Sequence, residues 1–144
     1  MKCKDVMSKN IKWATSDCTI QDAVEIMQEQ NCGVVPVVDE NQRIQGIVTD
    51  RDIVLFTVLQ HKNPETTKLG EFMTKDVITC LDEEDLNDLI TRMREYQIRR
   101  IPIVDQENKL IGMVSLGDIA VKVPQEEHEI YEALERISEP VHSY

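Results

Sequence analysis

Hydrophobic and polar positions follow two periodicities that succeed one another twice along the chain. Apolar residues recur three and four positions apart in two stretches, as on the buried face of a helix. These are Ile20, Ala23, Val24 and Met27, and then Leu86, Leu89, Ile90 and Met93. Thr19 and Asp85 stand where the N-cap of each helix would lie. The pattern therefore predicts two amphipathic helices with similar beginnings.

A pair of short strands is expected after each of these helices. Apolar runs at 34–38 and 100–104 each contain a proline, which lacks a ladder donor and favours a strand start, a bulge or an edge. Polar turns at 39–42 and 105–108 lead into a second apolar run. Two strands joined by about four polar residues are typical of a hairpin.

The chain carries an internal duplication. A shift of 66 residues aligns 7–54 with 73–120 without a gap, and 12 of the 48 aligned pairs are identical. We expect one repeat at 2–61, a connector at 62–67 and a second repeat at 68–122. Brief strands are expected at 11–14 and 77–80, a helix at 50–60, and matching short helices at 2–6 and 68–72.

The tail at 123–144 has no counterpart, and it contains a predicted helix at 125–138 with Ile130, Leu134 and Ile137 on one face. This helix would either cover the core or meet a second subunit.

The second strand of each repeat ends in a hydroxyl residue, and an aspartate follows three positions later. The two pairs are Thr49 with Asp52 and Ser115 with Asp118. At the first turn of a helix, free N–H groups and the helix dipole suit a phosphate, and a carboxylate can accept hydrogen bonds from a sugar diol. The same spacing also forms a capping box, which needs no ligand. Both interpretations remain open at the level of sequence.

Composition restricts the classes of function. The net charge of −11, with only one Trp, three Tyr and two Phe, disfavours a nucleic-acid surface. The four cysteines show no CxxC spacing and no cluster with histidine, so no metal site is expected and a reducing compartment is indicated. No apolar run has the length of a membrane span and the N-terminus lacks a signal-peptide core, so we expect a cytoplasmic protein that binds no membrane. No nucleophile elbow, Walker glycine loop or HExxH motif is present, so we expect no enzyme, no catalytic residue and no required cofactor.

The repeated unit resembles the CBS domain, which is named after cystathionine β-synthase. The resemblance rests on the glycine-led strand with its T/S-x-x-D ending and on the segments Val35-Pro36-Val37-Val38-Asp39 and Ile101-Pro102-Ile103-Val104-Asp105. Two copies would make a CBS pair, or Bateman module. The resemblance implies a mixed α/β (α+β) fold of two tandem β-α-β-β-α repeats, packed about a pseudo-two-fold axis, plus the C-terminal helix.

The resemblance also implies adenosine-containing ligands in clefts between the two repeats. Asp52 and Asp118 would bond ribose, and Thr49 and Ser115 would face phosphate. In one cleft, adenine would lie against Ile11, Cys32, Gly33 and Val34. In the other cleft, it would lie against Val77, Ile98 and the two arginines that follow Ile98. In the family each cleft draws on both repeats. Ser115 and Asp118 are therefore expected to face the first group, and Thr49 and Asp52 the second.

The two sites are not expected to be equal. Arg99 and Arg100 stand where the first repeat has Gly33 and Val34, and guanidinium groups suit phosphate. A charged nucleotide would therefore prefer the arginine-bearing site. The alternative is that the two arginines are solvated or paired with surface acids.

Two functional hypotheses follow from the sequence. The first is a regulatory, signal-transducing module that senses AMP, ADP, ATP or an adenosyl compound, forms a homodimer and acts on an unidentified effector protein. The second is a structural dimerisation module without a small-molecule ligand.

Overall fold

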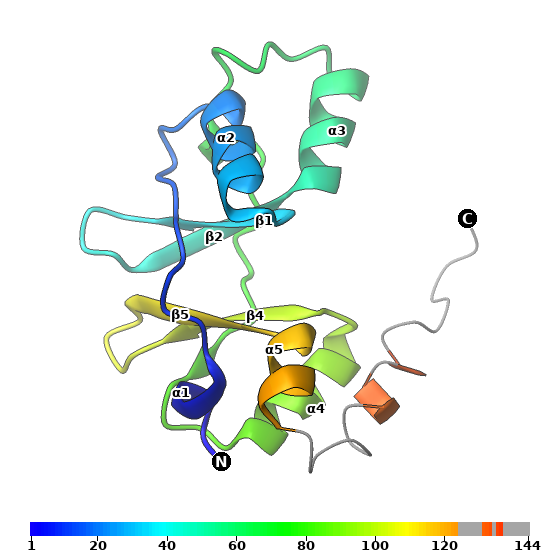
Figure 1. Cartoon of the computed structure of the whole chain (residues 1–144). Coiled ribbons are helices and arrows are strands. Elements are labelled where there is room, and N and C mark those ends of the chain that lie inside the picture. Colours follow the sequence, from blue (N-terminus) through cyan, green and yellow to red (C-terminus); the bar gives the residue numbers. More distant parts are fainter. Residues whose placement is uncertain (124–130, 134, 137–144) are drawn as a thin grey trace. The chain divides into compact units, whose positions relative to one another are not determined.

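The computed structural model describes residues 1–123, 131–133 and 135–136, which belong to two compact units (Figure 1). The first-repeat unit consists of residues 11–77 and 107–110. The second-repeat unit consists of residues 1–10 and 78–106 and the described residues from 111 onward. Each unit combines helices with strands, which confirms the predicted mixed α/β class.

The first-repeat unit is a β-hairpin with two helices on one face (Figure 1). Strands β1 (Val34–Val38) and β2 (Ile44–Thr49) pair antiparallel, and helices α2 (Ile20–Gln30) and α3 (Asp50–Leu59) lie over them. The buried core of the unit comprises Ala14, Ile20, Ala23, Met27, Val35, Val37, Val48, Ile53 and Leu69. Both predicted helices and the predicted hairpin are therefore confirmed in this unit.

A capping box fixes the start of α2. The Thr19 hydroxyl accepts from the Asp22 N–H at 3.2 Å, and the Thr19 N–H donates to the Asp22 carboxylate at 2.8 Å. The helix ends at Asn31, which adopts a left-handed conformation with φ of 50°. The prediction that Val24 belongs to the buried face is wrong, because its side chain is 45% exposed.

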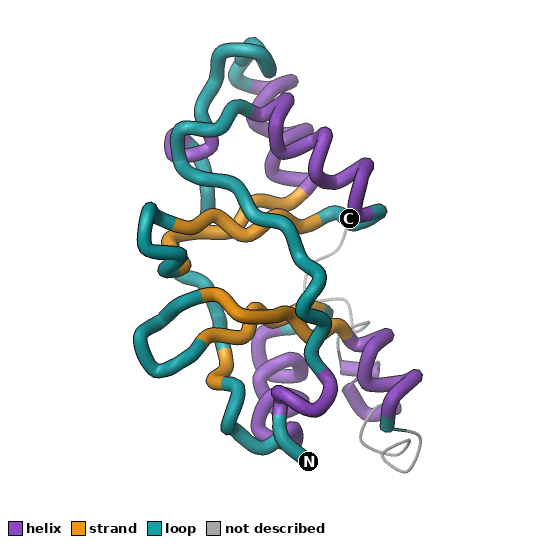
Figure 2. Tube along the Cα trace, turned by 60° about the vertical axis from the view of Figure 1, so that its left-hand side comes forward, coloured by secondary structure: helices purple, strands orange, loops and turns teal. Residues whose placement is uncertain are grey.

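The second-repeat unit contains a three-stranded sheet. The strand order is β3-β4-β5, with β3 (Cys80–Leu81) parallel to β4 (Arg100–Val104), and β5 (Leu110–Ser115) is the remaining neighbour of β4. Helix α4 (Leu86–Tyr96) begins at Asp85, whose side chain accepts from the Asn87 N–H at 2.9 Å. All four apolar residues predicted on its inner face are buried, namely Leu86, Leu89, Ile90 and Met93. Helix α5 (Leu116–Lys122) follows β5 directly. In Figure 2 the helices (purple) of each unit lie on one side of its strands (orange).

The opening segment of each repeat packs in the unit that the other repeat mainly builds. Helix α1 (Cys3–Val6) belongs to the second-repeat unit, where the Ser8 N–H donates to the Met113 carbonyl at 2.9 Å. The 3-10 helix η1 (Leu69–Glu71) belongs to the first-repeat unit, where the Thr74 N–H donates to the Ile47 carbonyl at 3.0 Å. Both short helices were predicted, but this exchange was not.

The glycine that leads each repeated motif makes room for the exchanged segment. A Cβ added to Gly46 would lie 2.7 Å from the sulfur of Met73 and 3.0 Å from the Thr74 carbonyl oxygen. At Gly112 the corresponding distances are 2.6 Å to the sulfur of Met7 and 3.1 Å to the Ser8 carbonyl oxygen. The identity of this position in both repeats therefore has a packing cause.

The two brief strands that were predicted before the amphipathic helices differ from expectation. No strand forms at 11–14, where Ala14 alone makes a parallel bridge to Val37 and donates its N–H to the Pro36 carbonyl at 3.0 Å. The strand expected at 77–80 is instead the two-residue β3. The register of the β1–β2 pair is irregular between Val37 and Val38, one residue beyond Pro36, in agreement with the bulge that proline favours.

The tail of the chain is described only in part. Residues 131–133 and 135–136 are helical, and Ala133 is buried in the core of the second-repeat unit. The predicted helical face of Ile130, Leu134 and Ile137 lies outside the described residues. None of the helices within the described ranges is long and apolar enough to cross a membrane.

Candidate functional site

The junction between β2 and α3 is a complete capping box. The Thr49 Oγ1 accepts from the Asp52 N–H at 3.1 Å, and the Thr49 N–H donates to the Asp52 Oδ2 at 3.2 Å. Both side chains are half-buried. The structural interpretation of this motif is therefore realised in full.

The junction between β5 and α5 repeats this geometry. The Ser115 Oγ accepts from the Asp118 N–H at 3.0 Å, and the Ser115 N–H donates to the Asp118 Oδ2 at 2.9 Å. In both boxes the cap engages one carboxylate oxygen, Oδ2. The other oxygen, Oδ1, has no hydrogen-bond partner within the part of the chain that the structure describes. Capping thus leaves each aspartate with an acceptor for a ligand hydroxyl, and the two interpretations are compatible.

Each junction lies beside the segment that enters the first hairpin strand of the same repeat. In the first repeat, Val34 is the register partner of Thr49, and the Asp50 N–H donates to the Gly33 carbonyl at 2.9 Å. In the second, the Leu116 N–H donates to the Arg99 carbonyl at 2.9 Å. The structure therefore places each predicted hydroxyl–aspartate pair beside the entering segment of its own repeat. The expectation that each pair faces the segment of the other repeat stays a prediction.

The first junction is acidic. Asp50 and Asp52 both lie in the first turn of α3, with Arg51 between them. A Cβ added to Gly33 would lie 2.7 Å from the Asp50 Oδ2, so the carboxylate is close against the glycine backbone. A side chain larger than hydrogen at this position would require the carboxylate to move.

The second junction has the opposite charge balance. Leu116 and Gly117 replace the acid and the arginine, Asp118 is the one acid in the first turn of α5, and Arg99 and Arg100 lie on the adjoining segment. Both arginine side chains are exposed, and neither pairs with an acid within the described residues. Within the described residues, these arginines are therefore exposed to solvent and are not paired with surface acids.

The remaining predicted site residues are divided between the two units. Ile11, Cys32 and Val77 are half-buried in the first-repeat unit, and the Cys32 thiol donates to the Val34 carbonyl at 3.3 Å. Ile98 packs against the core of the second-repeat unit. Their roles toward a base remain predictions. No group of three or more His, Cys, Asp or Glu side chains that could hold a metal occurs among the described residues.

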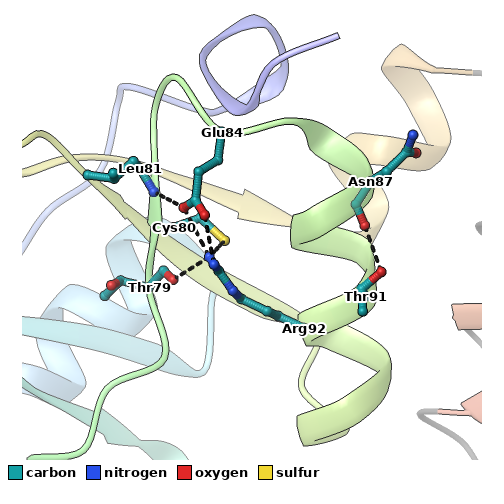
Figure 3. Close-up of polar contacts among 7 residues, drawn as sticks. All are labelled: Thr79, Cys80, Leu81, Glu84, Asn87, Thr91 and Arg92. Carbon is teal, nitrogen blue, oxygen red and sulfur yellow. Dashed lines mark hydrogen bonds and ion pairs between the residues drawn. The ribbon is translucent and has the colours of Figure 1, made fainter.

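A charged cluster lies elsewhere, between β3 and α4 (Figure 3). The Arg92 guanidinium forms a two-pronged ion pair with Glu84, with distances of 3.0 and 2.7 Å, and its Nη1 lies 2.7 Å from the Cys80 sulfur. The hydrogen bonds from Arg92 lower the pKa of the Glu84 carboxyl, and the bond with Glu84 raises the pKa of the guanidinium. The sequence motifs gave no signal for this cluster, because its members share no recognised spacing.

The fold and the twin junctions define a tandem-repeat α/β module, and comparison with known proteins identifies its family. The chain belongs to the CBS domain family, whose profile matches residues 3–58 and 69–125. The resemblance inferred from the repeated motifs is thereby confirmed.

Relatives support the assignment over most of the chain. The CBS domain-containing protein YhcV of Bacillus subtilis (strain 168) is 39% identical over 118 residues, which is 82% of each chain. The CBS domain pair of protein MJ0100, solved in complex with 5′-methylthioadenosine and S-adenosyl-L-methionine, matches with a TM-score of 0.75 and 30% identity, covering 88% of this chain and 98% of that one. CBSX2 from Arabidopsis thaliana, solved in complex with AMP, matches with a TM-score of 0.75 and 25% identity over the same shares.

Proposed function

We propose that this protein is a regulatory module that senses adenosine-containing nucleotides through its two strand-to-helix junctions. The observation that carries the proposal is the pair of half-buried aspartates, Asp52 and Asp118, each with one oxygen in a cap and the other available as an acceptor. The adenosyl ligands of the MJ0100 CBS pair and of CBSX2 support the choice of ligand class.

The residues take the following roles in this proposal. Asp52 and Asp118 accept hydrogen bonds from ribose hydroxyls, while Thr49 and Ser115 lie at the phosphate side. Arg99 and Arg100 supply positive charge for phosphate in one of the two sites only. Adenine packs against the half-buried apolar residues of the entering segments and their neighbours, namely Ile11, Cys32, Gly33, Val34, Val77 and Ile98. With a net charge of −11 opposing an anion, we expect an affinity of about 1 μM.

The output of such a module is regulatory rather than catalytic. Ligand changes its conformational equilibrium only by the difference between its affinities for the two states. We propose a cytoplasmic homodimer that passes this change to an effector protein. Helix α3 supports the dimer, because Val54, Val58 and Leu59 are apolar and more than half exposed.

The test is a thermal-shift panel of AMP, ADP, ATP, S-adenosylmethionine and NADH with the wild type and with Asp52→Ala and Asp118→Ala. A ligand at a hundred times its Kd stabilises the folded state by about 2.7 kcal/mol, which raises Tm by roughly 5–10 °C at this length. We expect a shift with at least one nucleotide and its loss in at least one variant.

Each aspartate substitution also removes a cap, so a matched control is needed. Asp22→Ala breaks the same capping box at α2, outside the proposed site. It should lower the Tm of the free protein by a similar amount, since a lost cap costs about 1 kcal/mol, and leave the ligand-induced shift intact. If no ligand stabilises the wild type, the ligand-free structural module is the better interpretation. If both Asp52→Ala and Asp118→Ala keep the shift, the ligand binds but these two aspartates do not hold it.

A further inference from the structure

Two cysteines that are 77 positions apart in the sequence meet in the core of the second-repeat unit. Cys3 in α1 is fully buried and Cys80 in β3 is 2% exposed, and both belong to one apolar cluster. The two thiols interact closely enough to shift each other's pKa in opposite directions. The exchange of opening segments creates this contact, because α1 belongs to the first repeat and β3 to the second.

The environment of the two sulfurs is unequal. The Arg92 Nη1 lies 2.7 Å from the Cys80 sulfur and also donates to the Thr79 carbonyl at 3.0 Å, so the guanidinium is fixed against this thiol (Figure 3). The interaction with Cys3 and the charge of Arg92 lower the pKa of Cys80, whereas the same interaction and burial raise the pKa of Cys3. Cys80 is therefore the sulfur that carries thiolate character, and Cys3 the one that keeps its proton.

The chemistry of the pocket selects among possible reagents. A guanidinium beside the sulfur opposes a metal cation. Burial excludes bulky electrophiles and large disulfides, but a small neutral peroxide needs only a local opening. The route is α1, a four-residue helix. Main-chain bonds hold it (Cys3 N–H to Glu84 carbonyl and Lys4 N–H to Asp82 carbonyl, both 3.0 Å), together with a bond from the Lys122 ammonium to the Val6 carbonyl at 2.8 Å and exposed lysine pairs to Glu83. Exposed ion pairs add little stability, so a local opening of this short helix has to break only a few hydrogen bonds.

We propose that Cys80 and Cys3 form an oxidisable pair, in which a small peroxide oxidises Cys80 and Cys3 then closes a disulfide between α1 and β3. In the first step the Cys80 thiolate attacks one peroxide oxygen, the O–O bond breaks, and hydroxide leaves as the sulfenic acid forms. In the second step the Cys3 sulfur loses its proton and attacks the Cys80 sulfur, the S–O bond breaks, and water leaves. Two thiols are oxidised, one peroxide is reduced, and two waters result.

The experiment treats the full-length chain with hydrogen peroxide and follows intact mass and non-reducing peptide maps. We expect a loss of about 2 Da and one cross-linked peptide pair joining Cys3 to Cys80. The Tm should rise by roughly 5–10 °C, because the bond closes a long loop, and dithiothreitol should reverse it. Cys18 and Cys32 are the internal controls, since both are more exposed and have no arginine on the sulfur. Oxidation of these two ahead of the pair, or accumulation of Cys80 sulfenic acid without the cross-link, would overturn the proposal.

Two variants separate an effect of charge on the Cys80 thiolate from an effect of easier access to the buried sulfurs. Arg92→Gln removes the positive charge that lowers the pKa of Cys80, so it should reduce the thiolate fraction and slow disulfide formation severalfold. Glu84→Gln removes the negative charge that opposes the thiolate and should speed it. Both variants break the same ion pair, so an effect of access alone would change both rates in the same direction, and that result would also contradict the proposal.

Discussion

The main-chain N–H of Leu116 donates to the carbonyl of Arg99 at 2.9 Å, which fixes the arginine segment beside the first turn of α5. If these arginines bind phosphate, Arg99→Gln with Arg100→Gln should weaken AMP about 10- to 100-fold and leave adenosine nearly unchanged, because a charged hydrogen bond contributes about 1.5–3 kcal/mol. Titration calorimetry with both ligands measures the difference. Arg51→Gln at the first junction is the control, and equal weakening of AMP and adenosine would exclude a phosphate role.

Replacing the motif glycines should destabilise the protein through the exchanged segments. Gly46→Ala and Gly112→Ala each place a methyl group within 3.1 Å of a backbone oxygen, in addition to a methionine sulfur, and should cost about 1–3 kcal/mol of unfolding free energy. Denaturant unfolding measures this cost. Gly117→Ala is the matched control: its Cβ would meet nothing closer than the Ser115 hydroxyl at 3.7 Å, so it should be neutral or stabilise by up to about 1 kcal/mol.

The exposed face of α3 predicts the behaviour of the proposed dimer. Val58→Lys places a charge in that face, where Val58 is 63% exposed, and should shift the protein from dimer to monomer in light scattering after size exclusion. Val121→Lys on α5 substitutes a residue that is 79% exposed, and should leave the dimer intact. A wild-type monomer at micromolar concentration, or dissociation by both substitutions, would argue against this interface.

Stability should fall in acid, and the Arg92–Glu84 pair should contribute to the fall. Because Arg92 lowers the pKa of Glu84 in the folded state, the unfolded chain binds this proton more readily. The stabilisation is complete above the ordinary value of 4.5 and is lost as the pH falls through the folded-state pKa. Between pH 7 and pH 2, the free energy of unfolding should therefore fall less steeply for Glu84→Gln than for the wild type. The hydrogen bonds from Lys2 and Lys4 hold the pKa of Glu83 at about 2. Because Glu83 is exposed, salt should reduce its contribution to the pH dependence of stability. An unchanged pH dependence in Glu84→Gln would show that the pair does not contribute.

The features that the sequence predicted correctly are those with local causes. The capping boxes at Thr49 and Ser115 and the hairpin at 34–49 depend on residues a few positions apart, so their spacing is visible in the sequence. The roles of Asp52 and Asp118 toward a nucleotide stay predictions that the proposed titrations address.

The features that the sequence could not predict depend on which segments meet in space. Val24 and Ile90 occupy matching helical positions, yet Ile90 is buried in a cluster that includes Ala133 of the tail, which has no counterpart in the first repeat. The contact of Cys3 with Cys80 arises in the same way, because it requires α1 to pack in the unit that the other repeat builds. Periodicity identifies an apolar face but does not identify what covers it.

The exchange of opening segments also determines the order in which the chain can fold during synthesis. Residues 1–10 leave the ribosome before their packing partners, which lie at 78 and beyond, so α1 has to wait until most of the second repeat has been made. By contrast, the first-repeat unit lacks only residues 107–110 once the chain has reached residue 77. Residues 1–10 are therefore made early but reach their native contacts late, and until then Cys3 and Val6 are exposed to whatever the new chain meets.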